Sequence, residues 1–150
     1  MRTDVSTVAL LDVNVLIALL DPLHVHHEAC HQWFSARGSA PWASCAITQN
    51  GVMRILGNAR YPNSPGSPGV VSGILQALVM HPQHQFWESS PSLLSQAHVE
   101  PLALLDPAQI TDTYLLALSV HHGGRLATLD RRLSAHAVKG GAEALELISS

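Results

Sequence analysis

Two short apolar runs, each followed by an aspartate, limit the folds open to this chain more than any other feature. Residues 8–11 lead into Asp12, and residues 126–129 lead into Asp130. Short, largely apolar runs without alternation are typical of strands buried on both faces of a parallel sheet. Ligands of open α/β sheets collect beyond the carboxyl ends of such strands, so we expect both carboxylates on one rim of a sheet.

Helical and strand patterns alternate along the rest of the chain. Helices are predicted over residues 13–20, 24–37, 49–56, 70–80, 93–98 and 111–122, strands over 8–11, 42–45, 85–87 and 125–129, and residues 142–148 fit either a last strand or a helix. Residues 57–69 are rich in Gly and Pro and are predicted to form a surface loop. This βαβα order predicts an α/β fold, with a central, mostly parallel sheet flanked by helices. A length of 150 residues with 47% hydrophobic content suits a single domain over residues 1–150.

A third aspartate, Asp112, lies at the start of the helix predicted near residue 111. Thr111 is the predicted N-cap, and Asp112 then occupies the first turn, where the helix dipole favours an anion. Each aspartate alone has an ordinary interpretation as a turn or helix-start residue. Brought together, the three carboxylates would raise one another's pKa unless a cation lay among them. Oxygen-only ligands favour Mg²⁺ or Mn²⁺ over zinc.

Charge and cysteine content narrow the function classes. The net charge of -3, from 11 acidic and 8 basic residues, argues against a protein that grips nucleic acid through a broad basic surface, although a bound metal would add local positive charge. Cys30 and Cys45 are too few for a secreted disulfide scaffold and are expected to be reduced. The apolar stretch 8–20 is interrupted by Asp12 and Asn14, which is too polar for a signal or membrane-spanning segment. We therefore expect a cytoplasmic protein with no membrane partner.

A second metal-binding pattern competes with the aspartates. His27, Glu28 and His31 match the His-Glu-x-x-His pattern, in which two histidines hold zinc and the glutamate acts as general base. The apolar stripe of this predicted helix comprises Val25, Ala29, Trp33 and Ala36. His27 and His31 point away from that stripe and are predicted to face solvent. Because the helix also carries His24 and His26, a chance match is common, and a zinc metallopeptidase is the less favoured alternative.

The segments around the three aspartates, residues 10–19, 110–118 and 126–130, follow one another over nearly the whole chain. Together they resemble the three acidic motifs of PIN-domain ribonucleases, most closely the VapC-type toxins of bacterial toxin–antitoxin pairs. The resemblance implies a single Rossmann-like PIN domain that cleaves RNA with Mg²⁺ or Mn²⁺. It also implies a homodimer and a cognate antitoxin protein. The expected chemistry is hydrolysis of a phosphodiester bond by a metal-activated water.

Carried over by position, the resemblance makes Asp12 and Asp112 the principal metal ligands, with Asp130 completing the site. Thr128 and Asn14 would be supporting polar residues. From the residues alone, the Asn14 amide suits a hydrogen bond to a carboxylate or a metal-held water, or equally one to the local backbone.

One departure from the family pattern concerns the helix after the second predicted strand. The family usually carries a glutamate three residues after a threonine, whereas Thr48 is followed three residues later by Gly51. Asn50 or Gln49 would then supply a neutral oxygen or hold a water. With one carboxylate fewer, the site should bind a second cation more weakly than the first.

Two interpretations stay open at this point. Arg54, with Arg60 and Tyr61, either contacts substrate or is solvated surface. The missing glutamate also leaves a catalytically degenerate PIN-fold binding module as an alternative, although the presence of all three aspartates argues against it.

Overall fold

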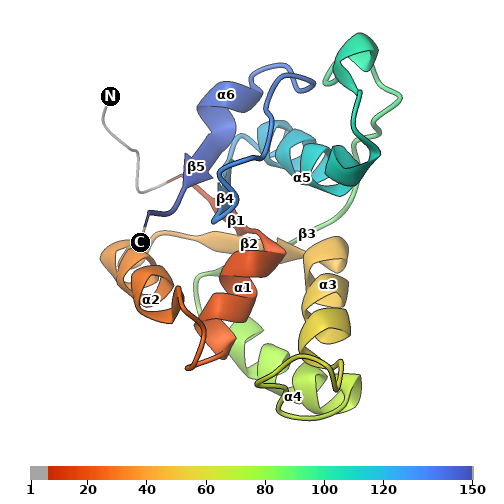
Figure 1. Cartoon of the computed structure of the whole chain (residues 1–150). Coiled ribbons are helices and arrows are strands. Elements are labelled where there is room, and N and C mark those ends of the chain that lie inside the picture. Colours follow the sequence, from red (N-terminus) through yellow and green to blue (C-terminus); the bar gives the residue numbers. More distant parts are fainter. Residues whose placement is uncertain (1–6, 150) are drawn as a thin grey trace.

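A five-stranded sheet in the order β3-β2-β1-β4-β5 forms the centre of the molecule (Figure 1). The computed structural model describes residues 7–149. In chain order its elements are β1 (Ala9–Leu11), α1 (Val13–Leu20), α2 (His27–Ala36), β2 (Trp42–Cys45), α3 (Ala46–Leu56), α4 (Pro68–Val79), β3 (His84–Trp87), the 3-10 helices η1 (Pro101–Ala103) and η2 (Pro107–Gln109), α5 (Ile110–His121), β4 (Arg125–Thr128), α6 (Gly141–Ala144) and β5 (Leu145–Leu147). Every strand pairing is parallel, which confirms the predicted α/β class.

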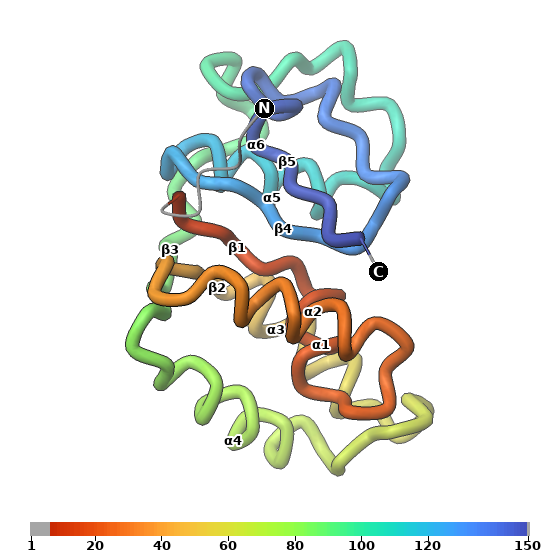
Figure 2. Tube along the Cα trace, turned by 90° about the vertical axis from the view of Figure 1, so that its left-hand side faces the viewer, coloured from red at the N-terminus to blue at the C-terminus, as the bar shows by residue number. Residues whose placement is uncertain are grey.

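The sheet buries both faces beneath helices, as its apolar strands predict. Ala9 and Leu11 of β1 pack into one cluster with residues of α1, α2, α3 and α4. Leu10 points to the opposite face and packs with residues of α5 and α6. Figures 1 and 2 show these two helical layers on either side of the strands. Because neighbouring strand residues face opposite ways, even the short β1 contributes to both halves of the core.

The chain leaves the centre of the sheet in two directions. From β1 it runs outward to β2 and β3, and it then returns to the other side of β1 to add β4 and β5. Leu11 of β1 is paired with Ala127 of β4, so the two strands end side by side. The strand order reverses between them, and the carboxyl ends of strands at such a point are where α/β folds place their ligands. Asp12 and Thr128 lie at this edge.

The boundaries of several elements differ from the sequence predictions. α2 begins at His27, because the Asp21 carboxylate accepts a hydrogen bond from Leu23 N (3.0 Å) and the residues up to His26 form turns. α5 begins one residue early, at Ile110, so Thr111 is not its N-cap. The 3-10 helix η2, in which Asp106 accepts from Ala108 N, leads directly into α5 and replaces a side-chain cap. Asp112 does lie in the first turn, as predicted.

The predicted helix over residues 93–98 is absent, and the prediction was wrong. The segment forms turns, and its end pairs with a distant part of the chain instead. Lys139 N donates to His98 O at 2.9 Å, and Val99 forms an antiparallel bridge with Val138. Nucleating a helix of so few residues is unfavourable, so these tertiary backbone bonds decide the conformation.

Three further features concern the tail, the cysteines and the apolar helices. The ambiguous tail 142–148 contains both the end of α6 and all of β5. Cys30 and Cys45 are buried free thiols. Within residues 7–149, no helix combines the length and apolar character needed to cross a membrane.

Candidate functional site

The hydroxyl of Thr128 is the centre of a hydrogen-bonded group at the carboxyl edge of the sheet. Thr128 Oγ1 donates to Asp12 Oδ2 at 2.7 Å, across the gap between β4 and β1. The other Asp12 oxygen, Oδ1, accepts from Val13 N at 2.7 Å, so the carboxylate also caps α1. Asp12 is only 5% exposed. Burial raises its pKa, the bonds from Thr128 and Val13 lower it, and nearby Asp130 raises it, so that the net pKa is above the usual value.

Asn14 and Asp130 complete this group. Asn14 Nδ2 donates to Thr128 Oγ1 at 3.3 Å, and Asn14 Oδ1 accepts from Leu129 N at 3.2 Å. Asp130 N donates to the same Thr128 oxygen at 3.1 Å. Thr128 therefore joins three of the residues selected from the sequence, Asp12, Asn14 and Asp130, and the Asn14 amide bonds across the rim to β4.

Asp112 approaches the same rim from the first turn of α5. Its side chain is half-buried, and its carboxylate makes no hydrogen bond within residues 7–149. Burial, followed by the charges of Asp12 and Asp130, raises the pKa of Asp112 to about 6. The electrostatic effect of both other aspartates on Asp112 means that the fold brings the three predicted carboxylates into one neighbourhood. Each would be stabilised by a positive charge placed among them.

The donor chemistry of the rim fits a hard divalent cation. Its ligand atoms would be carboxylate oxygens, which Mg²⁺ and Mn²⁺ prefer, and no group in residues 7–149 donates a hydrogen bond to the half-buried Asp112 carboxylate. In the part of the chain that the structure describes, no three His, Cys, Asp or Glu side chains are grouped closely enough to hold an ion by themselves. Mg²⁺ does not need three protein ligands, because it usually binds through one or two carboxylates and keeps several waters.

The position where the family pattern has a glutamate is closed by a neighbouring side chain. Gly51 is buried, and a Cβ built on it would lie 2.7 Å from Cγ2 of Val13, the residue that follows Asp12. Gln49 points elsewhere, because its Nε2 donates to Ser44 Oγ at 3.0 Å. Asn50 is exposed on α3, and its supporting role stays a prediction. The valine at position 13 therefore fits only because position 51 has no side chain.

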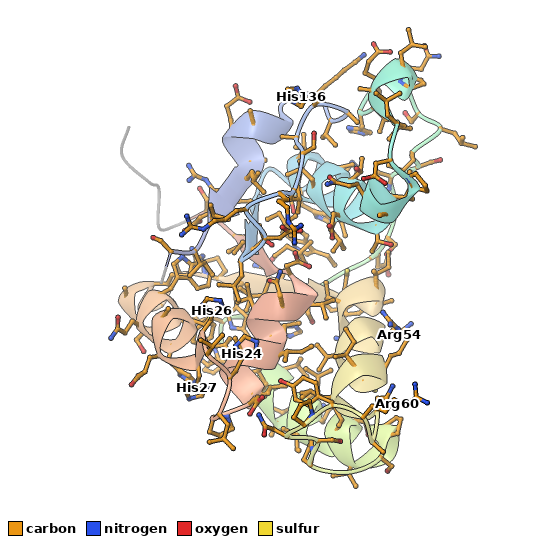
Figure 3. All side chains as sticks on the ribbon, in the orientation of Figure 1. His24, His26, His27, Arg54, Arg60 and His136 are labelled. Atoms are coloured by element: carbon orange, nitrogen blue, oxygen red, sulfur yellow. The ribbon has the colours of Figure 1, made fainter. Side chains whose placement is uncertain are left out.

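The cationic residues nearest in sequence to the rim are not the ones predicted. Arg54 projects from α3 on the side away from α1, and Arg60 also points outward (Figure 3). Contact of Arg54 with substrate stays a prediction. By contrast, Arg131 and Arg132 are exposed immediately after Asp130, and Arg132 N donates to Asp130 Oδ1 at 2.9 Å. This pair was not among the predicted residues, although two adjacent arginines directly follow a rim aspartate in the sequence.

Comparison with known proteins shows which family has this fold. A family model for the PIN domain matches residues 9–139. The chain belongs to the PIN domain family. It is 45% identical over 132 residues to Ribonuclease VapC44 of Mycobacterium tuberculosis, and the aligned residues cover 88% of this chain and 92% of the relative. It is 38% identical over 137 residues to Ribonuclease VapC39 of the same organism, covering 91% and 99%. Ribonuclease VapC29 is 38% identical over 125 residues, covering 83% and 87%.

The His-Glu-x-x-His pattern has a structural role in this PIN domain. His27 Nδ1 lies 2.7 Å from Ala18 O, and His31 Nε2 lies 3.1 Å from Leu19 O, so both rings contact the carboxyl end of α1. His31 is exposed, as predicted, whereas His27 is partly buried. Val25 lies outside the helix and is 85% exposed, so it does not belong to the apolar stripe, and the helix packs through Cys30, Trp33 and Phe34. Figure 3 shows His24, His26 and His27 gathered beside α1. With ring nitrogens bound to main-chain carbonyls, the pattern is explained without zinc.

Replacing Thr128 by valine tests the hydrogen-bonded group, because valine keeps the shape and removes the hydroxyl. We expect the free energy of unfolding to fall by about 1–3 kcal/mol, since the buried Asp12 carboxylate loses a donor. The apparent affinity for Mg²⁺ should weaken by roughly ten- to a hundredfold. The measurements are urea unfolding and Mg²⁺ titration of RNA cleavage. Thr128→Ser keeps the hydroxyl and should recover most of both properties, and equal defects in the two variants would contradict this role.

Proposed function

We propose that this PIN domain is a divalent-metal-dependent ribonuclease, the toxin component of a toxin–antitoxin pair, and that it hydrolyses RNA at the rim formed by Asp12, Asp112 and Asp130. The observation that supports this most directly is Asp112, a half-buried carboxylate without a hydrogen-bond donor in residues 7–149 and with a pKa raised to about 6 by burial and by the other two aspartates. The names of the relatives, all ribonucleases, point to the same chemistry.

The roles of the residues follow from their surroundings. PIN-domain ribonucleases generally depend on divalent metals. Asp12 and Asp112 would hold Mg²⁺ or Mn²⁺, and Asp130 and water would complete the site. When bound, the ion makes water more acidic and offsets charge on phosphate oxygens. Thr128 keeps the Asp12 carboxylate oriented, because it donates to one of its oxygens. Asn14 in turn holds Thr128 and the main chain of Leu129, which limits movement between α1 and β4.

The partners belong to the same proposal. RNA is the substrate, and a cognate antitoxin protein would block the site. A homodimer and a cytoplasmic location accompany this function. Of the apolar helices, α1 is largely buried in the core, whereas α4 exposes Val70 and Ile74. A contact with an antitoxin or a second copy is therefore better supported on α4.

The test is cleavage of a mixed RNA pool by purified protein with Mg²⁺, Mn²⁺, zinc or a chelator. Cleavage should require Mg²⁺ or Mn²⁺ and stop with the chelator. An Asp112→Asn protein purified in parallel controls for contaminating ribonucleases, and Glu88→Gln, an exposed loop substitution, is the matched control for loss of one carboxylate. Cleavage that survives both the chelator and Asp112→Asn would refute the proposal.

A further inference from the structure

A cavity of about 270 Å³ lies beside the rim, against the same helix turn and the same loop that carry the aspartates. Ile110 and Thr113, on either side of Asp112 in α5, form part of its wall, and Ser134 and His136, from the loop after Asp130, form another part. The remaining wall comes from residues 103–106 and Gln109. The cavity and the carboxylates therefore share the start of α5 and the loop after β4.

Gln109 fixes the cavity relative to the rim. Its Nε2 donates to Arg132 O at 3.0 Å, and its Oε1 accepts from Ser134 N at 3.0 Å. The start of α5 and the loop after β4 are thus one hydrogen-bonded unit. Figure 3 places His136 on the loop between β4 and α6, far from Arg54 and Arg60. A site prepared in this way needs little reorganisation when it binds a ligand.

We propose that this cavity binds one nucleobase of the RNA substrate, next to the phosphodiester bond that is cleaved at the rim. The proposal rests on the ribonuclease function proposed above. Pockets for drug-sized ligands begin at about 300 Å³, so this smaller cavity suits a single ring system. Leu104, Ile110 and Ala137 provide apolar surface for the base, and polar groups stand among them.

The polar groups suit the edge and the face of a base. Asp106 uses Oδ1 to accept from Ala108 N, and its Oδ2 makes no hydrogen bond to residues 7–149. A carboxylate accepts hydrogen bonds from exocyclic amino groups, as on cytosine N4, so Asp106 favours bases that present amino hydrogens. His136 is exposed and offers an aromatic face, and unstacked RNA bases stack on such side chains.

Charge beside the cavity also favours RNA over an apolar protein side chain. Arg131 and Arg132 are exposed between Asp130 at the rim and Ser134 and His136 in the cavity wall. Exposed arginines suit phosphates on either side of a bound base. An apolar side chain would offer no hydrogen bond to the exposed carboxylate of Asp106.

The test maps every cut in a randomised RNA oligonucleotide library for the native protein and for two variants. Asp106→Asn keeps the side-chain shape and the ability to cap η2 but exchanges a carboxylate oxygen for an amide. We expect it to alter base preference at one position beside the cut by roughly tenfold and to leave other positions unchanged. We expect His136→Ala to raise KM by roughly tenfold while kcat changes little. Glu88→Gln should behave like the native protein.

Active variants with the native base preference and native KM would overturn the inference and leave the ribonuclease function standing. If the native protein cleaves no RNA with any metal, the proposed function fails, and a second measurement decides the cavity. The imidazole NMR signals of His136 are followed during titration with cytidine 5′-monophosphate and, separately, ribose 5-phosphate. Shifts with the nucleotide alone support base binding. No shift, or equal shifts with both compounds, would overturn it.

Discussion

Asp112→Asn is expected to abolish RNA cleavage and at the same time to make the metal-free protein more stable. The substitution removes a carboxylate from the proposed metal site with little change in shape, so cleavage should fall by at least about a hundredfold. Stability should move the other way, because burial and the charges of Asp12 and Asp130 disfavour the ionised form of Asp112 in the folded state.

The difference in stability between the native protein and Asp112→Asn depends on pH. The pKa of Asp112 is raised from 3.8 to about 6, so the folded protein holds the proton more tightly than the unfolded chain. The stability that comes from this proton is fully present below pH 3.8 and is lost as the pH rises through about 6. The native protein therefore loses stability relative to Asp112→Asn over this window. The two proteins should differ most at neutral pH and converge in acid.

The size of the difference is modest because Asp112 is only half-buried and water screens its charge. We expect about 1 kcal/mol near neutral pH, or a rise in Tm of about 2–4 °C. Thermal unfolding with a chelator, over about pH 4 to 8, measures it. Mg²⁺ should reduce the difference in Tm between the two proteins by stabilising only the native one. The Tm of Glu88→Gln should follow that of the native protein at each pH. A variant that is less stable than the native protein at neutral pH would contradict the role assigned to Asp112.

The second large effect concerns position 51. Gly51→Glu, which restores the residue type of the family pattern, should lower the free energy of unfolding by at least about 2 kcal/mol. A Cβ at this position would lie 2.7 Å from Val13 Cγ2, and valine has few rotamers with which to move away. The new carboxylate would also join three others. We therefore expect no gain in cleavage from the single substitution.

Shortening the neighbour should relieve the strain. In the double variant Val13→Ala with Gly51→Glu, the two changes should be coupled, so that the loss is smaller than the sum of the single losses. Urea unfolding of the four proteins measures this coupling. Gly73→Ala in α4 is the matched helical control, because an added Cβ there meets nothing within 4 Å, and it should raise stability by up to about 1 kcal/mol. Additive losses would show that Val13 is not the cause.

Much of the fold could be predicted because the local signals agree with the tertiary structure. The strand over Trp42–Cys45 and the helix over Val13–Leu20 have the predicted limits, since apolar patterning and turn residues mark them clearly. The errors occur where distant parts of the chain intervene. The backbone at His98 pairs with Lys139, so residues 93–98 do not form a helix. Carbonyls at the end of α1 orient the histidines of α2, which no pattern within α2 could indicate.

For the candidate site, the sequence alone determined which carboxylates stand at strand ends and at a helix start. That information is local, because an apolar run and the polar residue that ends it are adjacent in the chain. Only the tertiary structure decided how these residues interact, since Thr128 and Asp12 are 116 positions apart and meet only through the pairing of β1 with β4. The contact of Gly51 with Val13 and the cavity beside Asp112 have the same origin. They depend on packing between separate elements, and side-chain spacing along the sequence does not encode it.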